Sequence, residues 1–492
     1  MTITPAPIQL LPEPGALIGD KIVTDGSGGE YEHVYAATGR LTKRVPLAGL
    51  HEVEMAVQAA HDALSVWQSM PLPQRRRLLI RVAELIRADA DAVGVLATVD
   101  SSVPKLVNDF LAISGADFLE YNAGWVDRVG GEIRPTSETR GVHAYVRDEP
   151  YGVVGAITPF NAPIIACCMV IGPVLAAGNT IVVKPSSLAP YAIMRLGQLF
   201  LEAGFPPGVV NFVPGPPQAG EALVRSAGVD KVFFEGSTKS AQYVLVAAAE
   251  SGPKPVALEL GGKSPALVFD DADLPTAVES VIGGGFTMGG QGCVLGTRLL
   301  VQASIYDEFV DLARTMTSSI VVGDPFTPET MMGPVANEQA CERVMGVIAD
   351  AVETGQGKLV AGGERLGGEL ADGYFIAPTL FADVDNTAAI AREEIFGPVL
   401  SIIRFETEAD ALRLANDSPY GLGAYIHTSD VRRVHRMAEG IEAGSVFVNG
   451  TPSGGPAPSL PFGGIKHSGY GRLGGIEAIR EFTQPKTIQI FS

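Results

Sequence analysis

The run "GVVGAIT" (residues 152–158) begins the part of the sequence that decides the fold, because four similar β-branched runs follow it at regular spacing. They are "TIVVKP" (180–185), "GVVNFVP" (208–214), "KVFFEGS" (231–237) and "PVALELGG" (255–262). Stretches of helical length lie between them, at 163–178, 190–204, 217–228 and 238–250. Strands that alternate with helices in this way pair in parallel through crossover connections. The pattern predicts an open α/β sheet, whose ligands bind at the carboxyl ends of the strands.

A second α/β block is predicted from about residue 264 to 470, where the strand-like runs are "PALVFD", "TRLLVQ", "VLSIIRF", "LGAYIH" and "SVFVNG". A helix-rich lead (51–126) precedes both blocks. Two further strand-like segments, 141–150 and 486–492, have no place in either block. Such strands often complete a sheet of another subunit. From the pattern alone, pairing of the two segments with each other is an equally good interpretation.

Composition excludes several classes of partner. The chain has 492 residues, with 55 acidic against 36 basic side chains and a net charge of −19. A nucleic acid or an anionic membrane surface would require a basic patch, so neither is expected. A negatively charged cofactor needs only local compensation and stays compatible with this charge.

Cysteine usage and hydropathy point to a cytoplasmic protein. Four cysteines in so long a chain are too few for a disulfide framework, which favours a reducing compartment. The N-terminal residues lack the basic and apolar regions of a signal peptide. The most apolar stretch, 164–178, is shorter than the roughly 20 residues of a membrane span and is interrupted by Pro173, so a buried globular helix is expected there.

Cys293, in "GGQGC" (289–293), differs from the other cysteines in its setting. A lone cysteine is usually a small buried hydrophobe. The glycines before it, however, would let a substrate carbon reach the sulfur and let backbone amides reach the substrate oxygen. Cys293 is therefore a candidate nucleophile.

Two polar residues could assist such a thiol. Glu259 follows the apolar run "PVAL" and precedes two glycines, where it is either a turn or cap residue or a partly desolvated general base. Asn161 lies in "TPFNAP", where it is either a turn former or an amide donor to a developing oxyanion. Each signal is weak when taken alone.

Other kinds of site are not expected. The seven histidines show no metal-ligand spacing, and neither a G-x-S-x-G nor a G-x-G-x-x-G motif occurs. We therefore predict no metal and no α/β-hydrolase chemistry. The stretch "GSTKSA" (236–241) follows a predicted strand and opens a predicted helix, whose N-terminal amides could hold a pyrophosphate.

Together these stretches resemble the aldehyde dehydrogenase superfamily, from about residue 20 to the C-terminus. The resemblance rests on seven motifs in the family's order and at close to its spacings: "TPFNAP", "VVKPSS", "FFEGST", "LELGGKSP", "GGQGC", "EEIFGPV" and "PFGGIKHSGYGR". It implies an aldehyde dehydrogenase-like α/β fold with two open α/β domains and a small β oligomerisation flap. It implies a dinucleotide-binding domain at 1–129 and 151–262, a catalytic domain at 263–477, and oligomerisation segments at 130–150 and 478–492.

The resemblance also assigns roles to matching positions. Cys293 would be the catalytic thiol, Glu259 the general base and Asn161 the oxyanion-hole amide. The thiol would add to an aldehyde, hydride would pass to NAD or NADP, and water would release the acid from a thioester. The cofactor would be bound by Ile157, Thr158, Pro159, Phe160, Lys184, Ser186, Ser187, Gly215, Gly220, Phe234, Gly236, Ser237, Leu260, Gly261, Glu394 and Phe396.

The substrate funnel of the family would here be formed by Ala162, Ile165, Ala166, Met169, Val294, Phe462 and the loop 450–460. These residues are apolar, and the loop contains no charged side chain. An unpaired charge on a substrate would meet a desolvation cost in such a funnel. Medium to large hydrophobic aldehydes are therefore expected, whether aromatic, terpenoid or long-chain aliphatic.

Two departures from the family pattern stand out. Glu235 occupies a position where threonine is common, and nothing in the sequence explains a carboxylate there. Ser187 stands three residues after Lys184, where NAD-restricted relatives commonly have a glutamate that repels the 2′-phosphate of NADP. Use of NADP as well as NAD is therefore expected.

Three functions are compared. A hydrolytic aldehyde dehydrogenase, assembled as a homodimer or homotetramer, fits best. A CoA-acylating semialdehyde dehydrogenase of the same fold would have no use for Glu259 as a base for water. A non-catalytic relative with a structural or binding role would not need Cys293, Glu259, Asn161 and Glu394 together.

Overall fold

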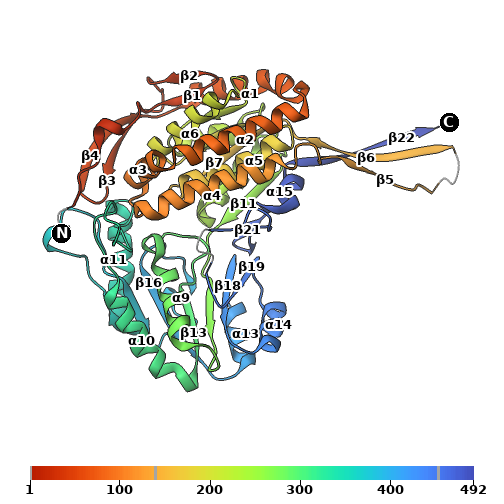
Figure 1. Cartoon of the computed structure of the whole chain (residues 1–492). Helices are drawn as coiled ribbons and strands as arrows, with labels where there is room; N and C mark the ends of the chain where they lie inside the picture. Colours follow the sequence, from red (N-terminus) through yellow and green to blue (C-terminus); the bar gives the residue numbers. More distant parts are fainter. Residues whose placement is uncertain (1–2, 138–140, 452–454, 492) are drawn as a thin grey trace.

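The computed structural model describes residues 3–137, 141–451 and 455–491. Within these ranges it contains two large sheets, each covered by helices on both faces, and a long three-stranded arm (Figure 1). No helix in the described ranges is long and apolar enough to cross a membrane.

The first sheet has eight strands in the order β2-β1-β9-β8-β7-β10-β11-β21. The five central strands are parallel, as the alternation of runs and helices predicts. The strands are β1 (Ala16–Ile18), β2 (Lys21–Val23), β7 (Val153–Thr158), β8 (Thr180–Pro185), β9 (Val210–Phe212), β10 (Lys231–Gly236), β11 (Val256–Leu260) and β21 (Gly469–Tyr470).

Helices cover both faces of this sheet because successive strand residues point to opposite sides. In β7, for example, Val153 joins the core formed with α1, α7 and α8, whereas Val154 joins the core formed with α2–α6. The apolar stretch expected as a globular helix is α5, which is buried along its whole length. The helices are α1 (Leu50–Ser69), α2 (Leu72–Ala88), α3 (Ala90–Ser101), α4 (Lys105–Ala123), α5 (Pro163–Ala176), α6 (Pro190–Ala203), α7 (Pro217–Arg225) and α8 (Thr238–Glu250).

The second sheet has seven strands in the order β14-β15-β16-β13-β12-β18-β19. Its strands are β12 (Pro265–Val268), β13 (Arg298–Gln302), β14 (Lys358–Ala361), β15 (Thr379–Ala382), β16 (Val399–Phe405), β18 (Gly423–His427) and β19 (Ser445–Val448). The helices of this part are α9 (Leu274–Phe286), α10 (Tyr306–Ser319), α11 (Glu338–Glu353), α12 (Ala389–Arg392), α13 (Glu408–Asn416) and α14 (Val431–Gly440). The last helix, α15 (Gly475–Glu481), packs instead against α5 of the first part. Helices α9 and α10 pack on one face, and α11, α13 and α14 on the other.

The arm consists of β5 (Gly131–Ile133), β6 (Val142–Pro150) and β22 (Thr483–Phe491). It extends away from both large sheets, and the C-terminal end of the chain lies near its tip (Figure 1). The two segments expected outside the α/β blocks therefore pair with each other, in antiparallel register over all nine residues of β22. Residues 138–140 and Ser492, which belong to the predicted oligomerisation segments, lie outside the described residues. Two small pairings complete the fold: β3 (Glu30–Tyr35) with β4 (Arg40–Pro46), and β17 (Tyr420–Gly421) with β20 (Ile465–Lys466).

Candidate active site

Cys293 lies in a turn between α9 and β13, where glycines allow a sharp change of chain direction. Gly290 has a φ of 71°. A Cβ at this position would lie 2.1 Å from the carbonyl oxygen of Gly397, so no other residue fits without a shift of the backbone. The thiol borders a cavity of about 470 Å³ that Glu259 and Asn161 also line. The structure therefore brings the three predicted catalytic residues together.

Glu259 reaches this cavity from β11, next to the end of a parallel strand. Its side chain is buried, and neither carboxylate oxygen has a hydrogen-bond partner among the described residues. Burial raises the pKa of Glu259 well above its usual value, and the neighbouring Glu235 adds to the effect. A carboxylate with a raised pKa accepts a proton more readily than an exposed one, which suits the task of a general base.

Asn161 lies between β7 and α5. Its Nδ2 donates a hydrogen bond of 2.8 Å to the carbonyl oxygen of Gln291, two residues before the thiol. This bond fixes the amide beside Cys293 and uses one of its two N–H groups, so the second is available for a substrate oxygen. Burial, followed by the charges of Glu235, Glu394 and Glu259, raises the pKa of the Cys293 thiol well above its usual value.

The residues predicted to bind the cofactor gather at the carboxyl edge of the first sheet, or border it. Lys184, near the end of β8, is buried, and its side-chain amine has neither a hydrogen bond nor an ion pair with a described residue. Burial lowers the pKa of its amine to about 8. Gly220 of α7 lies against it, since a Cβ on this glycine would lie 3.8 Å from Lys184 Cδ and 3.3 Å from Ile157 Cδ1.

The loop after β10 leads directly into α8, a helix of 13 residues. Ser237 caps this helix by accepting a hydrogen bond of 3.1 Å from the backbone N–H of Ser240. Gly236 has no room for a side chain, because a Cβ there would lie 2.7 Å from Phe234 Cζ. The remaining first-turn N–H groups of α8 offer donors for a phosphate.

On the opposite side of the edge, Glu394 approaches the end of β11 from the second block. Its Oε1 accepts a hydrogen bond of 3.1 Å from the backbone N–H of Gly262. A Cβ on Gly261 would lie 2.0 Å from Glu394 Oε2, so glycine is required for this approach. Burial raises the pKa of Glu394 to about 7. The rings of Phe160 and Phe396 meet edge to face, with centroids 5.9 Å apart.

The other predicted cofactor residues lie along the same edge in less distinctive surroundings. Thr158 is buried, and its hydroxyl is 3.4 Å from the Sγ of Cys167 in α5, so it faces the helix. Ser186 accepts a hydrogen bond of 3.3 Å from the backbone N–H of Leu188, while Ser187 is half-buried. A Cβ on Gly215 would lie 2.6 Å from the Cβ of Ala219. Pro159 follows β7, and Leu260 ends β11.

These features fit a dinucleotide. An unpartnered cation, a helix N-terminus and a buried carboxyl group follow one another along the edge at which open α/β sheets bind their ligands. A pyrophosphate would find donors at α8, and ribose hydroxyls would find a cation at Lys184 and an acceptor at Glu394. Among the described residues, no three histidine, cysteine, aspartate or glutamate side chains are grouped as metal ligands.

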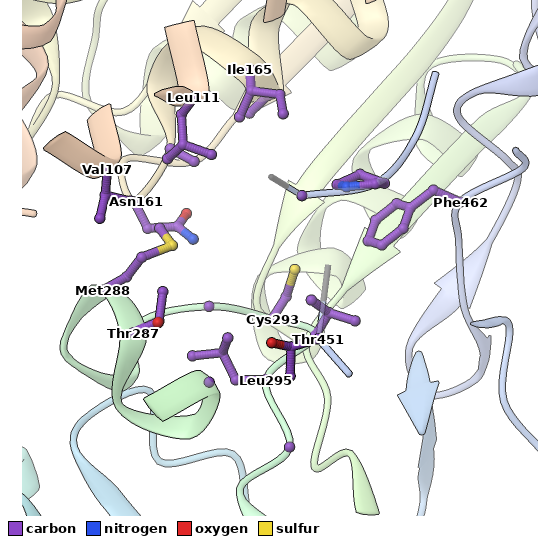
Figure 2. A pocket seen from close by; sticks show the side chains of 18 of the residues that line it. Val107, Leu111, Asn161, Ile165, Thr287, Met288, Cys293, Leu295, Thr451 and Phe462 are labelled. Atoms are coloured by element: carbon purple, nitrogen blue, oxygen red, sulfur yellow. The ribbon is translucent and has the colours of Figure 1, made fainter. Parts of the chain in front are cut away.

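All six predicted substrate residues line the cavity that contains the thiol. Figure 2 shows Cys293 between Phe462 on one side and Val107, Leu111 and Asn161 on the other. Sequence reasoning missed the contribution of α4, of the turn after α9 and of the second sheet. The lining residues it missed include Leu106, Val107, Phe110, Leu111, Val281, Thr287, Met288, Leu295, Tyr425, Phe447 and Leu473. Of the loop 450–460, Thr451, Gly455 and Pro456 line the cavity, and residues 452–454 lie outside the described residues.

One feature of α4 could have indicated this part of the site. Leu106 and Phe110 are apolar and stand one helical turn apart, and they lie outside the face that α4 buries, with exposed fractions of 70% and 43%. Exposed apolar residues at this spacing indicate a binding surface. Sequence alone does not show which surface α4 turns toward the thiol.

Comparison with known proteins agrees with the fold. The family model described as the aldehyde dehydrogenase family matches residues 22–488. Retinal dehydrogenase 2 of Mus musculus is 38% identical over 99% of this chain and 95% of its own length. The structure of a mutant aldehyde dehydrogenase from Bacillus cereus has a TM-score of 0.95 at 35% identity and covers 100% of both chains.

A third relative is the betaine aldehyde dehydrogenase of Staphylococcus aureus, solved in complex with NAD⁺. It has a TM-score of 0.94 at 30% identity and covers 98% of this chain and 96% of its own. The fold is therefore that of a two-sheet α/β dehydrogenase. The chain belongs to the aldehyde dehydrogenase family and is an oxidoreductase that acts on aldehydes.

Proposed function

We propose that this protein oxidises hydrophobic aldehydes to carboxylic acids with NAD⁺ or NADP⁺, through a thioester on Cys293. The observation that carries the proposal is the cavity in which Cys293 and the unpartnered Glu259 meet within a largely apolar lining. A nucleophile, a separate base and an amide donor are the groups that this reaction requires.

Each protein group has one task in this mechanism. The sulfur of Cys293 attacks the aldehyde carbon, and the amide N–H of Asn161 stabilises the oxyanion that forms. The bound dinucleotide supplies the acceptor for the hydride that leaves this carbon. Glu259 then removes a proton from water, which attacks the thioester and frees the thiol. The raised pKa of Glu259 makes it a stronger base than an exposed carboxylate would be.

The residues at the edge of the first sheet would hold the cofactor. Lys184 would bind the adenosine ribose, Gly236 and Ser237 the pyrophosphate, and Glu394 the nicotinamide ribose, with Phe396 packed beside it. The Staphylococcus aureus relative is described in complex with NAD⁺, which supports this cofactor. The small, uncharged Ser187 leaves space and no repulsion for the 2′-phosphate of NADP⁺.

The lining of the cavity supports the substrate class. Among the described residues that line it, Glu235 and Glu259 are the only charged side chains, and no lysine or arginine is present to pair with a substrate carboxylate. One of the relatives is named a retinal dehydrogenase, and retinal is a hydrophobic aldehyde. Apolar contact with α4 should therefore raise the affinity for the substrate by about 0.8 kcal/mol per buried methylene.

Values of kcat/KM for a series of straight-chain aldehydes test this class, with benzaldehyde, betaine aldehyde and succinate semialdehyde alongside. We expect kcat/KM to rise with chain length until the cavity is filled. Leu111→Lys places a cation in the cavity wall. In this variant kcat/KM for long-chain aldehydes should fall, and kcat/KM for succinate semialdehyde should rise. Ile113→Lys is the matched control, because Ile113 is 39% exposed on the same helix and does not line the cavity. A wild-type preference for acetaldehyde or for a charged aldehyde would refute the proposed class.

We further propose that the first sheet binds the cofactor, that the second carries the catalytic thiol, and that the arm joins subunits in a homodimer or a homotetramer. The exposed edges of the arm support this assembly, because strands with free edges pair readily with other chains. Cysteine usage supports a cytoplasmic location.

A further inference from the structure

Glu235, which the function proposed above leaves unused, stands next to the proposed base. It is the last but one residue of β10, and its Cα is paired in parallel register with that of Glu259 in β11. Paired positions on neighbouring parallel strands direct their side chains to the same face of the sheet. Accordingly, Glu235, Glu259 and Cys293 all line the same cavity.

Among the described residues, neither carboxyl group is paired with a cation. The half-buried side chain of Glu235 forms no hydrogen bond or ion pair with them, and both oxygens of Glu259 are buried without a partner there. Burial raises the pKa of Glu235 to about 7. An unpaired carboxyl group that borders a largely apolar cavity costs free energy of folding, so a purely structural role does not explain this residue.

The groups that face Glu235 are mostly acids and thiols. Glu259 faces it from β11, Cys293 from the turn after α9, and Cys167 from α5. On its other side, β7 places the apolar Ile157 beside Phe234. Further charged groups shift the pKa values of these neighbours. Glu394 raises the pKa of Cys293, and on Glu259 Arg472 lowers the pKa while Glu481 raises it. Cys293 in turn raises the pKa of Tyr425.

Two carboxyl groups and a thiol that border one largely apolar cavity do not ionise independently, because each negative charge opposes the next. At neutral pH the three groups must retain protons among them. Loss of the thiol proton is then easiest when a neighbouring carboxylate accepts it and the total charge of the cavity stays constant. After burial, Glu235 is the strongest influence on the Cys293 thiol, ahead of Glu394 and Glu259.

We propose that Glu235 is the proton acceptor for Cys293, distinct from Glu259, which serves the water step. This inference rests on the proposed thioester mechanism. As the sulfur bonds to the aldehyde carbon, the S–H bond breaks and an O–H bond forms on Glu235. When water later displaces the thiolate, Glu235 returns the same proton to sulfur, and Glu259 takes the proton lost by water. No electron is gained or lost by either carboxyl group.

Alkylation of Cys293 by iodoacetamide tests this assignment on the protein without cofactor. The rate is measured from about pH 6 to about pH 10 for wild type and for Glu235→Gln, which keeps the shape and removes the acid. Peptide mass identifies Cys293 as the labelled residue; Cys167, Cys168 and Cys341 are buried. In wild type the rate should rise through about pH 7, where Glu235 becomes able to accept a proton.

In Glu235→Gln the rise near neutral pH should vanish, because burial alone still holds the thiol pKa high. At pH values near 8 the rate should be about a hundredfold lower or more, the size of a general-base contribution. Glu235→Asp, which retains the carboxyl group, should restore the neutral rise. The same loss should appear in the first turnover of aldehyde oxidation.

Two results would overturn the assignment: an unchanged profile in Glu235→Gln, or faster alkylation near neutral pH, since the latter would show that Glu235 only repels the thiolate. Cys293→Ala separates this proposal from the function on which it rests. If Cys293→Ala still oxidises aldehydes, the thioester mechanism itself fails. If Cys293→Ala is inactive while Glu235→Gln reacts like wild type, only the role of Glu235 fails.

Discussion

Lys184, Glu235 and Glu259 have ionisable side-chain groups that form no hydrogen bond or ion pair with a described residue, and burial shifts the pKa of each. Leaving such groups unpaired costs free energy of folding. All three stand close to the carboxyl ends of parallel strands in the first sheet. The cost is explained if the cofactor and the reacting atoms supply the missing partners.

The residue at position 187 should decide which dinucleotides are accepted. Ser187 is small and uncharged, so wild type should turn over with NADP⁺ as well as with NAD⁺. Ser187→Glu should reduce kcat/KM for NADP⁺ by about tenfold or more and leave that for NAD⁺ within a few-fold, because a carboxylate repels the 2′-phosphate. Steady-state kinetics with both cofactors measure the effect. Strict use of NAD⁺ by wild type would refute this prediction.

Gly261 should control the position of Glu394. A methyl group at position 261 would lie 2.0 Å from the Glu394 carboxylate and must displace it. We therefore expect Gly261→Ala to weaken NAD⁺ binding, measured by calorimetry, by about tenfold. Gly346→Ala is the matched control, since this helical glycine has no atom within 4 Å of an added Cβ, and it should bind NAD⁺ normally. Equal affinities for the two variants would show that Glu394 does not hold the cofactor.

At the scale of elements, the alternation of strands and helices from 152 to 262 was sufficient to predict the parallel core of the first sheet, and the structure confirms it. Its edges could not be predicted. Strand β21 has two residues, too few for a periodic pattern, yet it pairs with β11 so that Gly469 lies opposite Glu259. This contact joins segments far apart in the sequence, and only packing reveals it.

The arm should be the element that joins subunits. Deleting residues 486–492 removes most of β22 and leaves β6 without its longest partner. Light scattering should then show a shift toward monomer, while circular dichroism should remain close to that of wild type, because the arm lies outside both large sheets. Ile490 and Phe491 are 54% and 69% exposed, as expected for residues that contact another chain. A full-length protein that is already monomeric at micromolar concentration would contradict this role.

At the scale of the whole molecule, the site is formed where the two large sheets approach one another. Glu259 and Asn161 come from the first block, and Cys293 and Glu394 from the second. Each of these residues gives only a weak signal in the sequence when taken alone. We could predict the site because the motifs that contain them follow the order of the aldehyde dehydrogenase family. The structure adds their proximity, which the sequence does not contain.

Two features of the site lay beyond sequence reasoning for a physical reason. The wall contributed by α4 depends on how a helix outside both blocks packs against α5. The neighbourhood of Glu235 depends on the register between β10 and β11, which no local pattern determines. Both are long-range contacts, and both border the cavity that contains Cys293.

In the proposed mechanism Cys293 carries the acyl group and Glu259 activates the water that removes it. The most direct measurement is the intact mass of Glu259→Gln after incubation with a hydrophobic aldehyde and NAD⁺, followed by peptide mapping. We expect turnover to fall by about a hundredfold or more and an acyl adduct to form on Cys293, close to one per chain, which is absent from Cys293→Ala. A Glu259→Gln protein that turns over near the wild-type rate with no adduct on Cys293 would contradict it.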